Sequence, residues 1–308
     1  VFLGRKQTDS QRTRLWVSAE EAIATLDASQ ATSVAAIADA IPDLATKPDL
    51  SWLVEDGVTV SSSSCAATLD GRDAPGPANI AWLSSLCVSE RVSSLTIFNG
   101  PLTDVPNLLS RACITSGKDD DEEASLLTLA LDFRPRAYGA YEMADAQGNY
   151  PGPDVLGRKS FEYSGNRKDF DTKFGTEEVV NFVNGLVSTC DGAVVVGQAD
   201  DVSELELLTK GPLALSIAMP LTDANVAAVA EARSKAASYW LGWALDGSHT
   251  HRPGAPINSQ FVYDTKYRQN SYGAILPVYT SLFGPDDGAK IAAADSGPLD
   301  EGYVGGGS

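Results

Sequence analysis

Basic residues and histidine are scarce in this chain of 308 residues. There are 23 Lys and Arg against 41 Asp and Glu, which gives a formal net charge of −18. Nucleic acids and anionic membrane surfaces both attract basic proteins, so this balance disfavours both kinds of partner. The two histidines, His249 and His251, fall in one loop-like segment. A histidine-based triad is therefore disfavoured, and solvation is the more ordinary fate of two loop histidines than ligation of a metal.

Cysteine is also rare, and the four cysteines lie far apart at Cys65, Cys87, Cys113 and Cys190. No pair has the C-x-x-C spacing of zinc or iron–sulfur sites, so we predict free, mostly buried thiols in an intracellular or organellar protein. No apolar run approaches the roughly 18 residues that a transmembrane helix needs. P-loop, nucleophile-elbow and dinucleotide-binding motifs are missing too. The chain begins at Val1, which suggests a mature form that has lost a targeting segment.

Strand-like segments are plentiful and follow one another closely. Residues 79–90, 92–99, 108–115 and 125–133 are apolar, rich in β-formers and separated by short polar links. Such links favour an antiparallel meander. Further strands are predicted at 58–64, 193–196 and 213–218. The charged run at 118–123 interrupts the meander, and we interpret it as a solvated hairpin turn rather than a metal site, since consecutive acids cannot all face one ion.

Helical patterns flank these strands. Ser18 and Glu21 form a capping box, which predicts one helix to Ala28 and a second over 32–41. Thr176 is the expected N-cap of one later helix, and Thr222 or Asp223 that of another, which reaches Leu245. Residues 260–271 are predicted to be either a last helix or the loop and helix start that carries Asp264. Together the elements predict an α+β fold: an α/β/α sandwich with a central antiparallel sheet covered by helices on both faces. We expect an N-terminal arm (1–17), a single domain (18–295) and a flexible tail (296–308).

Several strings in this order resemble red chlorophyll catabolite reductase, a family of the ferredoxin-dependent bilin reductase superfamily. They are AWLSSLC, TDVPNLL and LALDFRPR in the strand region, and SKAASYWLGWAL, DTKYR and YTSLFG nearer the C-terminus. The resemblance covers about two thirds of the chain. It implies the same sandwich and a pocket for a linear tetrapyrrole. It further implies that reduced ferredoxin supplies single electrons, that the protein has no cofactor of its own, and that acidic side chains supply the protons.

The resemblance assigns two proton-donating carboxylates, and only one of them is present. Asp264 matches the second, and Lys266 and Arg268 beside it are candidates to bind pigment carboxylates. The first falls on Arg111, where the family has glutamate. Arginine cannot act as a general acid, although it can clamp a carboxylate. Arg111 is therefore a candidate ligand-binding residue, unless it points to solvent or pairs with a local acid. Five aromatic residues are candidates for a pigment wall, although core packing is the more ordinary role of each: Trp82, Phe98, Trp240, Trp243 and Tyr267.

Two hypotheses from different classes follow. The first is a non-catalytic relative that serves as a binding or scaffold subunit of a plastid pigment–protein assembly, with photosystem or antenna subunits as partners and a tetrapyrrole or chlorophyll as a bound pigment. It would be soluble or peripheral to the thylakoid membrane, and the missing glutamate favours it. The second is an active tetrapyrrole reductase in which Asp104 or Asp132 replaces the lost acid. It needs a basic patch for acidic ferredoxin, with these candidates: Arg158, Lys159, Arg167, Lys168 and Lys173. A pigment carrier is a third alternative.

Overall fold

The structure is a computed structural model that describes residues 16–41, 45–47, 60–66, 80–100, 103–115, 125–136, 167–197, 209–249 and 257–297. The strands are β1 (Ala45–Lys47), β2 (Val60–Ala66), β3 (Ile80–Val88), β4 (Val92–Asn99), β5 (Asn107–Thr115), β6 (Leu126–Arg134), β7 (Val194–Val195) and β8 (Leu215–Pro220). The helices are α1 (Ala19–Ala40), the short 3-10 turn η2 (Ser89–Arg91), α3 (Arg167–Lys173), α4 (Glu177–Thr189), α6 (Asp223–Leu245), α7 (Ile257–Phe283) and α8 (Pro285–Ser296).

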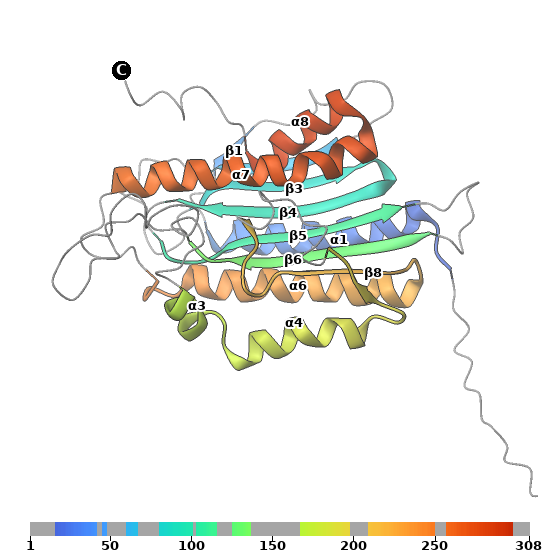
Figure 1. Ribbon diagram of the computed structural model, residues 1–308, viewed down its shortest axis with the longest axis horizontal. Helices are drawn as coiled ribbons and strands as arrows, with labels where there is room; N and C mark the ends of the chain where they lie inside the picture. The colour runs from blue at the N-terminus through green and yellow to red at the C-terminus, as the bar shows by residue number, and fades with distance from the viewer. Residues whose placement is uncertain are drawn as a thin grey trace, which may run out of the picture.

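One sheet of eight strands forms the middle of the molecule, in the order β1-β2-β3-β4-β5-β6-β8-β7 (Figure 1). Every neighbouring pair is antiparallel, so the predicted meander is confirmed. The strand bounds agree with the sequence pattern to within a few residues. In the register of β5 and β6, Arg111 lies opposite Ala130. Because side chains alternate along a strand, Leu109 and Cys113 share the face of Arg111, and Ser110 and Ala112 point the other way.

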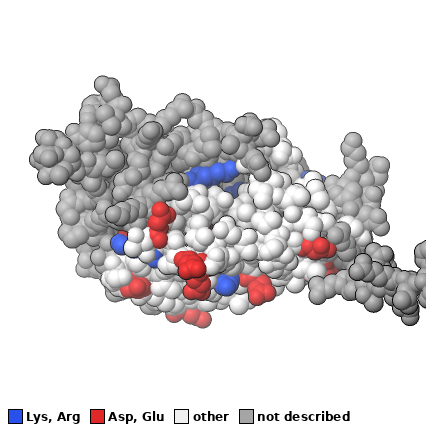
Figure 2. All heavy atoms as spheres, turned by 60° about the horizontal axis from the view of Figure 1, so that its bottom comes forward, with Lys and Arg blue, Asp and Glu red and all other residues white. Residues whose placement is uncertain are grey.

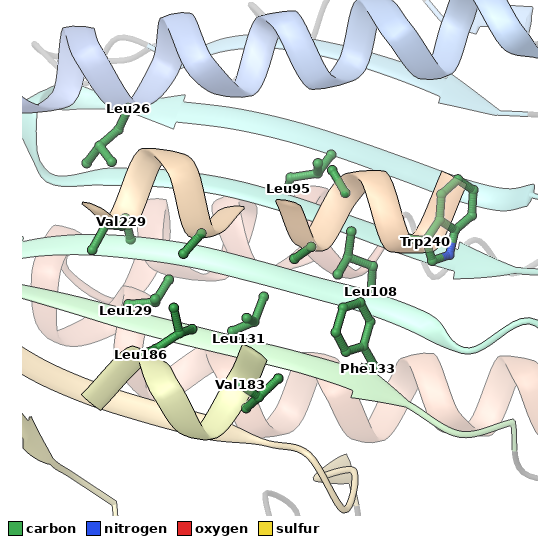
Figure 3. Close-up of a cluster of buried hydrophobic side chains, with 14 of the residues drawn as sticks. Leu26, Leu95, Leu108, Leu129, Leu131, Phe133, Val183, Leu186, Val229 and Trp240 are labelled. Atoms are coloured by element: carbon green, nitrogen blue, oxygen red, sulfur yellow. The ribbon is translucent and has the colours of Figure 1, made fainter. Parts of the chain in front are cut away.

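Helices α1, α4 and α6 cover one face of the sheet. Side chains from all three meet the inward residues of β4, β5 and β6, and Figure 3 shows Leu26, Val229 and Trp240 over Leu95, Leu108 and Leu129. Ser18 and Thr176 are N-caps as predicted, since Ser18 Oγ accepts from the Glu21 N–H and Thr176 Oγ1 accepts from the Val179 N–H. For α6 the N-cap is Thr222 rather than Asp223, since Thr222 Oγ1 accepts from the Asn225 N–H. This face holds the larger of the hydrophobic clusters among the described residues.

The prediction of two short helices at the N-terminus is wrong, because α1 is continuous. The polar residues at the expected break stay helical: Thr32 donates to the Ala28 carbonyl, and Ser33 donates to the Ser29 carbonyl. Gln30 is buried and reaches the sheet, where its Nε2 donates to Ser85 Oγ and its Oε1 accepts from Ser93 Oγ. This tertiary contact outweighs the weak local helix propensity of the segment.

Arg233 of α6 is 4 % exposed and joins Gln30, Ser93 and Ser110 in a buried polar cluster between the helices and the sheet, called here the polar seam. It donates to the hydroxyls of Ser93 and Ser110 and to Gln30. Burial lowers its pKa to about 10, and the nearby acidic Asp27 offsets this only in part. The seam fixes α1 and α6 against the sheet through hydrogen bonds rather than through apolar contacts alone.

Helices α7 and α8 cover part of the opposite face, over β3 and β4. Ile275, Tyr279 and Ile291 pack there against Leu86 and Val88. The predicted last helix, 260–271, was too short, since α7 runs on through Pro277 to Phe283, and α8 was not predicted. Gly284 adopts φ +84, a conformation that suits glycine, and Pro285 then starts α8. Helices on both faces of an antiparallel sheet confirm the predicted α+β sandwich.

No helix among the described residues is long and apolar enough to cross a membrane. Several predicted features lie outside the described residues: 1–15 of the arm, the charged run 118–123, 298–308 of the tail, His251, Arg158 and Lys159.

Candidate functional site

A cavity of about 240 Å³ lies between the sheet and α7, on the face that carries Arg111. Its floor comes from β4, β5, β6 and β8, one wall from α7, and its far end from the last residues of α8. The polar and charged side chains that line it are Thr96, Arg111, Thr128, Asp132, Arg134, Thr209, Lys210, Ser216, Ser271, Asp295 and Ser296. Leu109, Ile275, Val278 and other apolar groups complete the lining, so the cavity combines an apolar surface with a few charged groups, as ligand sites do.

Arg111 lines this cavity and is 8 % exposed, so it does not point to solvent. Its partner is Asp295, 184 residues further along the chain, whose Oδ2 lies 3.0 Å from Arg111 Nη2. The guanidinium also lies 5.4 Å from the centre of the Tyr279 ring. Burial disfavours the charged form, but Tyr279 and Asp295 outweigh it and raise the pKa of Arg111. The arginine therefore remains a cation at the cavity wall.

Asp295 of α8 is the residue of this site that the sequence did not indicate. Four side chains donate to its carboxylate: Thr96 at 2.7 Å, Ser94 at 3.2 Å, Arg111 at 3.0 Å and Tyr279 at 2.6 Å. A carboxylate has about four acceptor positions, so this one is fully used. Burial and the Asp295 charge raise the pKa of Tyr279 well above its usual value, which keeps the hydroxyl a donor. Nothing in the sequence around Asp295 distinguishes it from other helix-end acids.

Asp132 of β6 is the second carboxyl group in the cavity, and its surroundings differ. Its Oδ2 accepts from Arg134 Nε at 3.1 Å and from the Gly211 N–H at 2.9 Å. Its Oδ1 is buried and has no hydrogen-bond partner among the described residues. Burial raises the pKa of Asp132, although Arg134 and the Gly211 N–H oppose the shift. The sequence named Asp132 as one substitute for the missing acid, and the structure places it on the cavity wall.

Asp264, the carboxylate assigned by the resemblance, is not among the cavity-lining residues. Its Oδ1 lies 2.6 Å from Nη2 of Arg136, which also donates to the Thr103 carbonyl. Lys266 is exposed, and Arg268 is buried with its Nε donated to the Ser296 carbonyl at 2.9 Å. The cavity lining therefore includes Arg111 but not Asp264, Lys266 or Arg268. A proton-donor role for Asp264 and a ligand-binding role for Lys266 and Arg268 stay predictions.

The predicted aromatic wall divides between the two faces of the sheet. Trp82, Phe98 and Tyr267 pack together on the α7 side, and Phe98 lines the cavity. Trp240 and Trp243 lie on the opposite face with α6, where Trp243 meets the Phe133 ring edge-on. Neither of these two lines the cavity, and the fully buried Trp240 has the core role that the sequence favoured. The sequence alone did not show which face of the sheet α6 covers.

Asp104, the other substitute acid, lies in a separate cluster at the turn before β5. Its Oδ2 is 2.5 Å from Lys173 Nζ, and its Oδ1 is 3.5 Å from His249 Nδ1. The His249 ring packs against Phe174, and its carbonyl accepts from Thr103 Oγ1. None of these groups lines the cavity, so Asp104 has no access to a ligand there.

The basic patch expected for ferredoxin has one described side chain, Lys173, and that one is paired with Asp104. Exposed acids surround it on α3 and α4, including Asp171, Glu177 and Glu178. Figure 2 shows acidic side chains spread over the described part of this face, with few basic ones among them. The described surface of α3 and α4 is thus not a basic patch, and the contribution of the remaining predicted residues is untested.

No family model matches this sequence, and no curated protein matches it. Among solved structures, the chain is similar to phytochromobilin synthase from tomato, crystallised in complex with biliverdin. The similarity covers 88 % of this chain and 83 % of that one, with a TM-score of 0.51 and 12 % sequence identity. At this identity the comparison shows a shared fold. The comparison agrees with the predicted fold, and membership of the ferredoxin-dependent bilin reductase superfamily stays a prediction from the sequence.

Proposed function

We propose that the cavity binds a linear tetrapyrrole and that Asp132 donates protons to it during reduction by an external one-electron donor. The observation that carries the proposal is Asp132 itself, a buried carboxyl on the cavity wall with one oxygen unpaired among the described residues. The crystallised neighbour with the same fold holds biliverdin, which supports a tetrapyrrole as the ligand class. The finer resemblance to red chlorophyll catabolite reductase stays a prediction from the sequence.

The chemistry needs two electrons and two protons for each double bond that is reduced. Reduced ferredoxin can supply the electrons one at a time, each reduced ferredoxin being oxidised once. Oδ2 of Asp132 already accepts two hydrogen bonds, so a proton on this carboxyl is carried by Oδ1. A raised pKa keeps more of the acid form available near neutral pH, which suits a general acid. Asp132 can give one proton, regain it from solvent and then give the second.

The size of the cavity adds a constraint on how such a ligand lies. Pockets for drug-sized ligands commonly measure about 300–1,000 Å³, which is more than this cavity of about 240 Å³. A tetrapyrrole would be enclosed only in part. The sheet face offers an apolar continuation at the start of β6 and on β7, since Leu126 and Val194 are 44 % and 59 % exposed. Val194 lies opposite Ala218 in the register of β7 and β8, on the same face as the cavity-lining Ser216.

Binding without reduction is the second candidate. The observation that favours it is Arg111, which stands where the resemblance expects the proton-donating glutamate and forms an ion pair with Asp295. Asp264, the other expected donor, is held by Arg136 outside the cavity lining. A pigment carrier or a scaffold subunit of a photosystem–antenna assembly would both fit these facts. The assembly, its plastid location and its partners remain predictions from the sequence.

The test is a titration of the purified protein with biliverdin, followed by addition of a ferredoxin-reducing system, with absorption spectra recorded throughout. A shifted biliverdin band that bleaches only when ferredoxin is present supports the reductase. Asp132→Asn should then bind the pigment but slow bleaching by about 10²–10⁴-fold, the usual contribution of a general acid. Asp287→Asn on the outside of α8 is the matched control and should bleach at the normal rate. A shifted band with no bleaching supports the second candidate, and an unshifted band refutes both.

A further inference from the structure

We propose that Asp295 is a positioning residue: it holds the guanidinium of Arg111 at the end of the cavity, so that the remaining N–H groups of the arginine donate to an oxygen acceptor of the ligand. This inference rests on the proposed function and adds what the ligand must present at this wall. At the strand position where the resemblance expects a glutamate, the site thereby binds a hydrogen-bond acceptor of the ligand through Arg111.

The carboxylate of Asp295 is placed by the backbone on both sides of it. Trp82 Nε1 donates to the Ala294 carbonyl at 3.0 Å, and Arg268 Nε donates to the Ser296 carbonyl at 2.9 Å. The last carbonyls of a helix lack partners within the helix, so these two bonds fasten the end of α8 to the sheet and to α7. Asp295 between them is 1 % exposed and has no freedom to follow a ligand.

The bonding of Asp295 excludes it as a proton donor to the ligand. Its two oxygens accept from Ser94, Thr96, Arg111 and Tyr279, which fills its acceptor positions. A carboxylate whose acceptor positions are all occupied can affect the ligand only through the side chains that it positions. The group it holds in the cavity wall is Arg111, because Ser94 and Thr96 are short side chains of the sheet floor.

Arg111 keeps unused donors after this pairing. A guanidinium has five N–H groups; one on Nη2 meets Asp295, and the Tyr279 side chain is a second hydrogen-bond partner, so other N–H groups remain. Nε is buried and makes no hydrogen bond to any described residue. Tyr279 restrains the group from a second side, with its ring 5.4 Å from the guanidinium carbon. A guanidinium that is already held between a carboxylate and a ring face loses little further side-chain entropy when it donates a hydrogen bond to a bound ligand.

Asp132 places a hydrogen-bond acceptor, or an acid, near the Arg111 donor. It lies on β6 two residues beyond Ala130, the partner of Arg111, on the same face of the sheet. Such diagonal neighbours lie about 7–8 Å apart, with their Cβ atoms somewhat closer. The wall therefore offers a donor from β5 and an acceptor or acid from β6. A tetrapyrrole has both complements, N–H groups on its rings and oxygen on its terminal carbonyls and propionates.

The experiment measures biliverdin binding by absorption in wild type, Arg111→Lys, Asp295→Asn and the double variant, with thermal unfolding of each as a check on folding. Lysine keeps the charge, but its single ammonium group cannot bond Asp295 and the ligand together as the branched guanidinium can. Arg111→Lys should therefore bind biliverdin about tenfold more weakly or worse. Asp295→Asn should lose a similar factor, and the double variant should be no weaker than Arg111→Lys alone. That non-additivity is the signature of a residue that acts through another.

Controls and a second variant keep the test decisive. Arg91→Lys and Asp287→Asn, outside the cavity lining, should bind as wild type does. If Asp295→Asn does not fold, Asp295→Glu keeps the charge but moves the carboxylate by one methylene, and it should show the same loss. Repeating the titration with biliverdin dimethyl ester separates the acceptors: an equal loss in Arg111→Lys indicates a ring carbonyl, and a loss for the free acid alone indicates a propionate.

The outcomes also separate this inference from the proposed function. Wild-type protein that leaves the biliverdin spectrum unchanged refutes the proposed function, and the inference with it. Wild-type protein that binds the pigment, while folded Arg111→Lys or Asp295→Asn binds it with unchanged affinity, overturns only the role of Asp295. Losses that add in the double variant would assign Asp295 a purely structural role.

Discussion

Trp240 and Asn99 share one buried carbonyl, and the structure predicts that their substitutions are strongly coupled. The indole Nε1 of Trp240 donates to the Pro106 carbonyl at 3.0 Å, and Asn99 Nδ2 donates to the same oxygen at 2.9 Å. Asn99 Nδ2 also serves the Val105 carbonyl. These bonds hold the turn that leads into β5, the strand that carries Arg111. The carbonyl of Pro106 is buried, so it must keep at least one donor.

The magnitudes follow from which partner remains. Trp240→Phe loses one hydrogen bond, about 1 kcal/mol, because Asn99 still serves the carbonyl. The smaller ring leaves about 40 Å³ empty, which costs about 1 kcal/mol more at this fully buried site. Asn99→Ala costs about 2 kcal/mol, because the Val105 carbonyl then lacks its donor. In the double variant the Pro106 carbonyl has no side-chain donor left among the described residues, which adds a coupling of about 1–2 kcal/mol beyond the sum.

The assay is urea unfolding at pH 7.5, followed by far-UV circular dichroism so that loss of a tryptophan does not alter the signal. Trp243→Phe is the matched control on the same helix, and its effect should add to that of Asn99→Ala within about 0.5 kcal/mol. If Trp240→Phe and Asn99→Ala are additive to the same tolerance, the shared carbonyl is not what links α6 to the turn, and the reasoning is refuted.

Three further predictions concern the core and the cavity wall. Leu26→Ala should reduce the free energy of unfolding by about 3–4 kcal/mol, because Leu26 is fully buried on the sheet-facing side of α1. Leu245→Ala at a half-exposed site should cost under about 0.5 kcal/mol, and urea unfolding of both variants decides this. Gly211→Ala should destabilise the fold and perturb the cavity, since a Cβ there would lie 2.5 Å from Asp132 Oδ1 and 2.7 Å from the Phe133 carbonyl; thermal unfolding and biliverdin titration would show it, and a neutral variant would contradict the contact. Burial raises the folded-state pKa of Asp132, so its ionised form destabilises the fold most at pH values above that pKa, and this destabilisation fades as the pH falls toward 3.8. The free energy of unfolding of Asp132→Asn relative to wild type should therefore decline as the pH is lowered, in unfolding curves recorded from pH 7 to 4. A difference in free energy that does not change with pH would exclude the raised pKa.

Local patterns were sufficient for most of the sheet. The bounds 92–99 agree fully with β4, and the capping box at Ser18 starts α1 where predicted, because both depend on neighbours within a few residues. The division of α1 into two helices was wrong for the opposite reason. Gln30 is stabilised by Ser85 and Ser93 on the sheet, and no local pattern indicates partners more than 50 residues away.

The candidate site shows the same limit more sharply. The sequence itself determined that the protein is acidic, that the four strands between residues 79 and 133 pair in chain order as an antiparallel meander, and that a base stands at position 111. Those properties follow from composition and from short-range alternation along the chain. Only the tertiary structure decided that Asp295 meets Arg111, that Asp132 shares their cavity, and that Asp264 and Trp240 lie elsewhere. Arg111 and Asp295 are 184 residues apart, and their contact exists because α7 turns at Gly284 and returns α8 to the sheet. Which acid meets which base is set by packing of elements distant in sequence, and that packing leaves no periodic signal in the chain.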